Sequence, residues 1–304
     1  MRLLLAAAVL TVIAVSCGGS GDAGPTESPS DADSTFVGAD GIESVVTDTS
    51  RVITLSGDLT EFVYALGRGA SVVAVDVTTV HPAEATELPV VGVGRFLSAE
   101  AVLSHEPSLV IGDTQTAPLE AIAQIRATGV PVVILEVPTS FAALYAKIDD
   151  LGRLLGETEP ASDLRDRIRT DVEREQARVT TAGLRIAYLY TRGPDVNLLF
   201  GAGMVTNPLI EAAGGVDAGA DAGIEGSVPV TAEALVAAAP DVIIVPSVGF
   251  EAFDGIEGLL AIPGVAQTPA GRSGSILAYP EGDFLTFGPR VAETLHALIT
   301  DLAD

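Results

Sequence analysis

The chain is poor in several residue types that would point to a particular chemistry. Its 304 residues include one cysteine, Cys17, one lysine, Lys147, no tryptophan and only 5% aromatic residues. With a single cysteine the chain can form no internal disulfide. Three histidines and no cysteine after residue 17 are a poor fit to a dedicated zinc or manganese carrier. Cysteine nucleophiles are therefore excluded for everything after residue 17.

Basic residues are also scarce. The chain has 16 Lys and Arg against 41 Asp and Glu, a formal net charge of −25. Binding to a phosphate backbone needs a basic face, so nucleic acid is not an expected partner. An anionic ligand would have to meet locally placed arginines. The hydrophobic content of 48%, with 32 Gly and 18 Pro, is typical of a globular α/β protein with many short turns.

Recognisable catalytic motifs are missing as well. No nucleophile elbow occurs, and the glycine-rich segments at 67–70 and 92–95 lack the spacing of a phosphate-binding loop. We therefore predict a binding protein that catalyses no reaction. A lipid-anchored hydrolase or redox enzyme on an α/β scaffold is the remote alternative.

The first 17 residues have the features of a secretory signal. Arg2 gives a short positive start, and residues 3–15 form an apolar run that is too short for a mature membrane span. The sequence Ile13-Ala-Val-Ser-Cys17 resembles a bacterial lipobox, in which the cysteine is lipidated. An ordinary signal peptide with an incidental cysteine is the alternative. We expect an extracytoplasmic lipoprotein, anchored through Cys17 to the outer face of the cytoplasmic membrane.

Composition divides the rest of the chain into four parts. Residues 18–46 are rich in Gly, Ser, Asp, Thr and Pro, which predicts a flexible tether. Residues 47–137 and 183–304 alternate short apolar strands with helices, which predicts two α/β lobes with mostly parallel sheets. Residues 138–182 have apolar residues at helical spacing and no strand signal, so we expect one long helical connector, interrupted at Pro160. The expected strands are 52–55, 71–75, 109–111, 132–135, 185–189 and 275–279, and the expected helices include 58–66, 117–127, 208–213 and 289–302.

A similar phrase occurs twice, 133 positions apart. Leu97-Ser-Ala-Glu-Ala-Val-Leu is followed by Glu106-Pro-Ser-Leu-Val-Ile, and Val230-Thr-Ala-Glu-Ala-Leu-Val is followed by Ala239-Pro-Asp-Val-Ile-Ile. Each copy predicts a hydroxyl N-cap, a short helix with a glutamate in its first turn, a proline-marked turn and a buried strand. Two such units favour two similar lobes with a ligand between them.

These segments resemble a known family in their order along the chain. The resemblance is carried by Arg51-Val-Ile-Thr-Leu, Thr60-Glu-Phe-Val-Tyr-Ala-Leu-Gly, both copies of the repeated phrase, the helical connector and Phe287-Gly-Pro-Arg. Together they are similar to the substrate-binding lipoproteins of bacterial haem, siderophore and cobalamin ABC importers. The resemblance covers residues 51–304 and implies two Rossmann-like lobes bridged by a long helix. The segments most similar to the haem-binding members are Asp76-Val-Thr-Thr-Val-His-Pro, Gly94-Arg-Phe-Leu-Ser-Ala-Glu, Thr268-Pro-Ala-Gly and Phe287-Gly-Pro-Arg290.

His81 and Tyr190 are candidate ligands of haem iron. His81 lies in a polar loop after a strand, at the end of the sheet where open α/β sheets bind ligands. Tyr190 follows the strand at 185–189, and alternation puts it on the face of Tyr188, with Arg192 beside its hydroxyl. A ferric ion and a guanidinium both favour phenolate, and tyrosine is an established haem ligand.

The residues alone leave alternatives open for this site. His81 also fits a solvated loop histidine, and Tyr190 with Arg192 also fits the edge of a sheet with a surface ion pair. The resemblance favours the functional interpretation, since some haem-binding relatives use a His and a Tyr from opposite lobes, with an Arg near the Tyr. The other two histidines, His105 and His296, are expected to be structural.

Weaker candidates complete the predicted site. Arg95 and Arg290 lie in loops or helix starts where they could meet haem propionates, although surface roles fit them equally. Met204 could line an apolar pocket or pack in the core. In relatives from cobalamin and siderophore importers, glutamates of the repeated phrase pair with permease arginines, which implies docking roles for Glu100 and Glu233. A purely helix-stabilising role is the alternative.

The predicted function is capture of haem between two lobes and delivery to an ABC permease dimer with its ATPase. Haem would be the transported ligand, and the protein is expected to be a monomer. A ferric siderophore or a corrinoid is the alternative ligand. The low aromatic content and the lack of tryptophan count against a siderophore.

Overall fold

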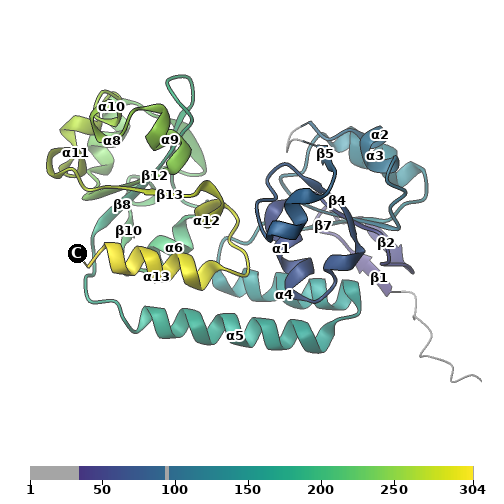
Figure 1. The fold of residues 1–304 in the computed structure, drawn as a ribbon. Coiled ribbons are helices and arrows are strands. Elements are labelled where there is room, and N and C mark those ends of the chain that lie inside the picture. The colour runs from purple at the N-terminus through teal and green to yellow at the C-terminus, as the bar shows by residue number, and fades with distance from the viewer. Residues whose placement is uncertain (1–33, 93–95, 304) are drawn as a thin grey trace, which may run out of the picture. The chain divides into compact units, whose positions relative to one another are not determined.

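The structure is a computed structural model, and it describes residues 34–92 and 96–303 (Figure 1). The signal peptide, Cys17 and Arg95 lie outside these residues, so the expectations about them stay predictions. Among the described residues, no helix is both long and apolar enough to cross a membrane.

The described part begins with a β-hairpin. Strand β1 (Ser34–Val37) pairs antiparallel with β2 (Glu43–Val46), so the prediction of a flexible tether is wrong for residues 34–46. Phe36 and Val46 are buried in the hydrophobic core, and Ser44 Oγ donates to the carbonyl of Val132 at 3.2 Å. Alternate apolar residues therefore attach this segment to the first lobe. The turn uses Gly41 in a left-handed conformation, with φ of 75°.

The first lobe contains a five-stranded parallel sheet with the order β5-β4-β3-β6-β7. Successive residues of one strand enter different clusters, as Val52 and Ile53 do, because side chains alternate between the faces of a sheet. Helix α1 packs in the cluster on one face, and α2 and α3 pack in the cluster on the other. The elements are β3 (Val52–Thr54), α1 (Gly57–Ala65), β4 (Val72–Asp76), β5 (Val90–Gly92), α2 (Ala99–Leu103), β6 (Leu109–Asp113), α3 (Leu119–Ala127) and β7 (Val132–Leu135), with 3₁₀ turns at Gly69–Ser71 and Ala83–Glu87.

The second lobe contains a mixed sheet with the order β11-β9-β8-β12-β13, in which β10 also pairs with β8. Strand β8 continues past the predicted end to Thr191, and β9 then returns antiparallel to it. The sequence analysis did not predict β9 or β11. The strands are β8 (Arg185–Thr191), β9 (Asn197–Phe200), β10 (Val216–Asp217), β11 (Ser227–Pro229), β12 (Val242–Pro246) and β13 (Ile276–Tyr279).

Helices cover both faces of this second sheet. One cluster includes side chains of α6, α12 and α13, and the other includes side chains of α7, α8, α10 and α11. The helices are α6 (Asn207–Ala212), α7 (Ala218–Asp221), α8 (Ala232–Ala238), α9 (Ser247–Ala252), α10 (Ile256–Leu259), α11 (Pro269–Ser273), α12 (Glu281–Leu285) and α13 (Val291–Asp301), with a 3₁₀ turn at Val265–Gln267.

Two helices connect the lobes. Helix α4 (Phe141–Leu155) ends at Gly156, which has a left-handed φ of 73°, and α5 (Thr158–Gln176) follows. The connector is therefore interrupted as predicted, but at Gly156 and not at Pro160. That proline lies in the first turn of α5, where its missing N–H leaves no intrahelical bond unmade.

The two connecting helices run antiparallel. Three contacts show this, because they pair later residues of α5 with earlier residues of α4: Gly152 lies against Ala161, Asp149 pairs with Arg165, and Arg169 lies over the ring of Tyr145. Helix α5 also meets α13 of the second lobe, where His296 Nδ1 lies 2.9 Å from Glu175 Oε2. Helix α5 is therefore the long bridging helix, and the predicted class of two Rossmann-like α/β lobes is confirmed.

Both copies of the repeated phrase adopt the same local structure. Ser98 Oγ accepts from the backbone N–H of Ala101 at 3.3 Å, and Thr231 Oγ1 accepts from that of Ala234 at 3.1 Å. The predicted N-caps are thus confirmed. The residue before the proline has a left-handed φ in both copies, 48° at Glu106 and 43° at Ala239.

Candidate functional site

Tyr190 and Arg192 meet a carboxylate that the sequence analysis did not identify. Glu281, the first residue of α12, accepts a hydrogen bond from Tyr190 Oη at 3.2 Å. Arg192 Nη2 donates to both oxygens of the same carboxylate, at 2.7 and 2.6 Å. The guanidinium carbon also lies 5.8 Å from the centre of the Tyr190 ring. The predicted proximity of Arg192 and Tyr190 is confirmed, with Glu281 as a third member.

The ionisation of Tyr190 depends on all three groups. Burial and the negative charge of Glu281 raise the pKa of the Tyr190 phenol, and Arg192 only partly opposes them. The phenol is therefore protonated at neutral pH in the ligand-free protein. Arg192 lowers the pKa of the phenol, as expected, but Glu281 raises it.

Aromatic side chains hold Tyr190 in place. Its ring stacks on that of Phe200, with centroids 5.8 Å apart and an interplanar angle of 18°. Phe200 in turn contacts the buried Tyr188, which contacts Phe284 of α12. Tyr188 and Tyr190 belong to the same hydrophobic cluster, as strand alternation predicts.

His81 lies in the first lobe, in the exposed loop that follows β4. Its neighbour Val80 touches the second lobe, because a Cβ added to Gly282 would lie 3.2 Å from Val80 Cγ2. Gly282 directly follows Glu281, the partner of Tyr190. The structure thus brings the loop of His81 and the helix of Glu281 together, although these segments are about 200 residues apart in the sequence.

Exposed apolar side chains lie in the segments that follow strands of the first sheet, in loops and at the start of α3. Phe96 is 79% exposed, Leu119 is 72% exposed, and Val77 and Val80 are about half exposed. Hydrogen bonds from Val77 N to the Gly92 carbonyl and from Leu97 N to the Ala117 carbonyl bring these loops side by side. The carboxyl edge of this sheet, which bears His81, therefore offers apolar surface to a ligand.

Arg290 occupies a different environment from the one that a propionate ligand needs. Its guanidinium donates to both oxygens of Glu61 in α1, at 3.0 and 3.1 Å, and to Asp283 at 3.2 Å. All three nitrogens of the guanidinium are thus engaged by protein carboxylates. Met204 is half-buried and packs against the core, in agreement with a packing role.

Glu100 and Glu233 are both exposed, and each lies in the first turn of its helix, α2 or α8. Each is the second residue of its helix, two positions after the hydroxyl N-cap. Of the histidines expected to be structural, His296 contacts Glu175 and Arg178.

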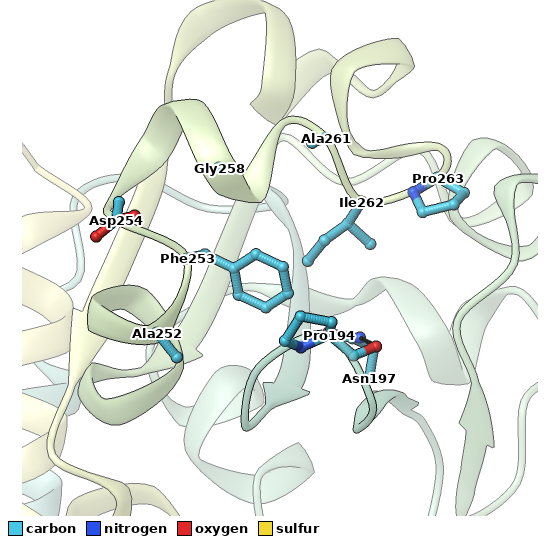
Figure 2. Close-up of a pocket in the computed structure, with 9 residues that line it drawn as sticks. All are labelled: Pro194, Asn197, Ala252, Phe253, Asp254, Gly258, Ala261, Ile262 and Pro263. Carbon is cyan, nitrogen blue, oxygen red and sulfur yellow. Dashed lines mark hydrogen bonds between the residues drawn. The ribbon is translucent and has the colours of Figure 1, made fainter.

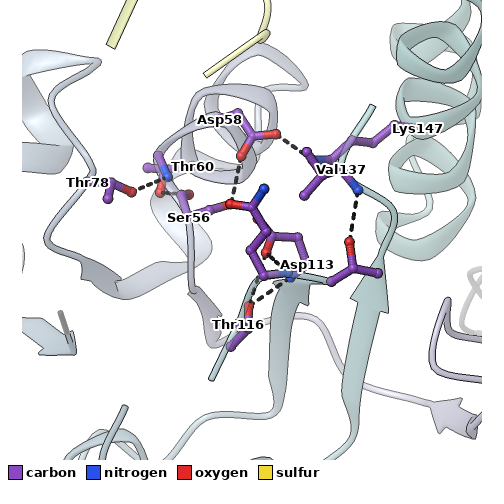
Figure 3. A network of polar contacts seen from close by, with 11 residues as sticks. Ser56, Asp58, Thr60, Thr78, Asp113, Thr116, Val137 and Lys147 are labelled. Carbon is purple, nitrogen blue, oxygen red and sulfur yellow. Dashed lines mark hydrogen bonds and ion pairs between the residues drawn. The ribbon is translucent and has the colours of Figure 1, made fainter. Parts of the chain in front are cut away.

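A buried polar network lies at the centre of the first sheet (Figure 3). Lys147 of α4 forms an ion pair with Asp58 of α1, and both side chains are almost completely buried. Asp113, at the end of β6, lies near them, and burial and the charge of Asp58 raise its pKa. The strand order of this sheet reverses between β3 and β6. In open α/β sheets, ligands often bind beside the ends of the strands at such a reversal. Here these groups bind one another, and the sequence analysis did not identify them.

A separate cavity of about 420 Å³ lies beside the turn that joins β8 to β9 (Figure 2). Phe253, Pro194 and Ile262 give it an apolar wall, and Asn197 lies at its base. None of the predicted site residues lines it. Within residues 34–92 and 96–303, no three His, Cys, Asp or Glu side chains are grouped so as to hold a metal ion.

Solved structures of haem-binding proteins are similar to this chain. The periplasmic haem-binding protein RhuT from Roseiflexus sp. RS-1, in its apo form, is 39% identical with a TM-score of 0.79, over 84% of this chain and 98% of that one. The haem-binding protein HmuT is 35% identical with a TM-score of 0.83, over 93% of this chain and 95% of that one. HmuT structures with a tyrosine, an arginine or a histidine replaced by alanine are also known, and that tyrosine and arginine stand two positions apart, as Tyr190 and Arg192 do.

Curated relatives are more distant. An ABC transporter substrate-binding lipoprotein of Bacillus subtilis, YvrC, is 27% identical over 65% of this chain, and the match spans 63% of that protein. The cobalamin-binding protein of Halobacterium salinarum is 26% identical over 82% of this chain and 68% of its own length. Residues 52–282 match the family model described as periplasmic binding protein. That match, the paired α/β lobes and the helical bridge show that the chain belongs to the periplasmic binding protein family.

Proposed function

We propose that this protein captures haem between its two lobes and delivers it to an ABC permease. The observation that carries the proposal is the Tyr190–Arg192 pair, which lies beside the helix that touches the loop of His81. A phenol, a guanidinium and an imidazole are suited to a ferric porphyrin, because two of them can bind iron and the third can hold the phenolate. The haem-binding relatives of similar fold support this choice.

In the proposed complex Tyr190 and His81 bind the iron from opposite sides, and Arg192 stabilises the Tyr190 phenolate. The exposed side chains of Phe96 and Leu119 contact the apolar porphyrin, which would remove their surfaces from water. Arg95 remains a candidate partner for a propionate. Arg290 is less suited to that role, because Glu61 and Asp283 already hold it.

A corrinoid is the second candidate ligand, and the similarity to a cobalamin-binding protein over 82% of the chain favours it. The test is a titration of the purified protein with haemin and, separately, with cyanocobalamin. We expect haemin to give a stoichiometric change in the Soret band and cyanocobalamin to bind more weakly. Tighter binding of cyanocobalamin would reject the haem proposal in favour of the corrinoid.

We further propose that the protein works outside the cytoplasmic membrane as a lipid-anchored monomer. The anchor is Cys17, in its lipobox-like context. Membrane fractionation of a Cys17→Ser variant tests this, and a variant that stays with the membranes like the wild type would reject it. Docking to the two permease subunits through Glu100 and Glu233 belongs to the same proposal. The proposed role is to bind and deliver a ligand, without a catalysed reaction.

A further inference from the structure

The carboxylate of Glu281 binds the phenol oxygen that the haem proposal assigns to iron. It accepts the phenol proton of Tyr190 at 3.2 Å, and that proton has to leave before the oxygen can bind iron as phenolate. It also holds Arg192 through two hydrogen bonds at 2.7 and 2.6 Å. One side chain therefore engages two of the three groups that the haem proposal requires.

We propose that Glu281 is an internal competitor of the ligand, which holds Tyr190 and Arg192 in the empty protein and has to leave Tyr190 before iron binds there. This inference rests on the proposed function, and it adds a residue that sets affinity and selectivity at the same site. A ligand without a metal ion offers nothing that replaces Glu281 at the Tyr190 oxygen, so such a ligand is disfavoured.

The backbone around Glu281 is held on both sides. Phe284, three residues later in α12, is completely buried in the aromatic row beneath Tyr188. On the other side Gly282 lies against Val80, so that a single added carbon would come within 3.2 Å of it. The Glu281 side chain is 23% exposed and ends at the half-exposed Arg192. Release of Tyr190 therefore requires a rotation of the Glu281 side chain, while α12 stays in place.

The competition can be observed without any ligand. The chain has no tryptophan and five tyrosines, so its intrinsic emission comes from tyrosine alone. A carboxylate that accepts a phenol proton quenches tyrosine emission. We expect Glu281→Ala to increase the emission of the ligand-free protein, and Glu281→Ala with Tyr190→Phe to abolish this increase. A Glu281→Ala variant with the emission of the wild type would overturn the proposal.

Binding gives the second readout. We expect the dissociation constant for haemin to fall by about twofold to fivefold in Glu281→Ala, the range of a partly exposed polar interaction. The preference for haemin over metal-free protoporphyrin should fall as well, with Glu281→Gln intermediate because its amide oxygen still accepts from Tyr190. Glu251→Ala, an exposed glutamate of the same lobe, serves as the control. Weaker haemin binding in Glu281→Ala would contradict the competitor role. Failure of the wild type to bind haemin would reject the proposed function, whereas the emission test would still decide whether Glu281 holds Tyr190.

Discussion

Arg290 donates two hydrogen bonds to the carboxylate of Glu61, which lies 229 positions earlier in the sequence. Glu61 belongs to α1 of the first lobe and its side chain is only 5% exposed, whereas Arg290 precedes the last helix of the second lobe. Asp283 completes the arrangement. The second lobe is thus fastened to α1 by a charged pair that is largely removed from water.

Loss of this arginine should destabilise the protein. We expect Arg290→Met to reduce the free energy of unfolding by about 2–4 kcal/mol, because Glu61 is left buried without its partner. Urea denaturation measures the change. The control is Asp150→Asn, which breaks an exposed pair with Arg153 and should cost less than about 0.5 kcal/mol. Equal effects of the two substitutions would show that the Glu61 pair contributes no more than a surface contact.

The buried pair of Lys147 and Asp58 leads to a double-mutant prediction. We expect Lys147→Met to cost about 3 kcal/mol, since Asp58 remains buried without a cation beside Asp113. Asp58→Asn added to Lys147→Met should restore part of this loss, because the unpaired charge is then removed. Denaturation of both single variants and the double variant tests the coupling. A double variant less stable than Lys147→Met alone would argue against it.

The lowered pKa of Glu175 predicts how the stability of the protein changes in acid. Its burial acts to raise the pKa, but hydrogen bonds from Arg178 and His296 outweigh burial and hold the pKa below its ordinary value of 4.5. A lowered pKa means that the stabilisation is complete above this ordinary value and is lost as the pH falls through the lowered one. The wild type should therefore lose more stability than Glu175→Gln between about pH 5 and pH 3. Glu173→Gln, exposed on the same helix, is the control. Parallel pH profiles of wild type and Glu175→Gln would refute the assignment.

The two glutamates of the repeated phrase should affect transport and leave ligand binding unchanged. We expect Glu100→Ala with Glu233→Ala to lower haem uptake by at least about tenfold, as loss of two charged contacts to a partner would, with haemin affinity unchanged. Glu120 and Glu257 are exposed first-turn glutamates outside the repeated phrase, and their double alanine variant is the matched control. Uptake at the wild-type level would leave only the helix-stabilising role.

Local sequence signals predicted the fold well. Ser98 and Thr231 cap their helices as expected, because an N-cap depends on residues three positions apart. The boundaries of two segments were predicted wrongly because their glycine turn signals are weak. Asp40 and Gly41 mark the turn of the first hairpin, and Gly156, rather than Pro160, separates the connecting helices.

The candidate site was predicted only in part. Tyr190 and Arg192 were found because strand alternation places them together. Glu281 was missed because it is 91 positions away and reaches them only through the packing of α12. The ion pairs of Lys147 and Arg290 were missed for the same reason, since each joins segments that no local pattern connects.

The ligation of iron by His81 and Tyr190 is the central claim, and the absorption spectrum of the ferric haem complex tests it most directly. We expect Tyr190→Ala to lose the charge-transfer band of iron-bound phenolate and to bind haemin more weakly. His81→Ala should shift the Soret band and retain the phenolate band, whereas His105→Ala should match the wild type. Spectra unchanged in both the His81→Ala and the Tyr190→Ala complexes would contradict the claim.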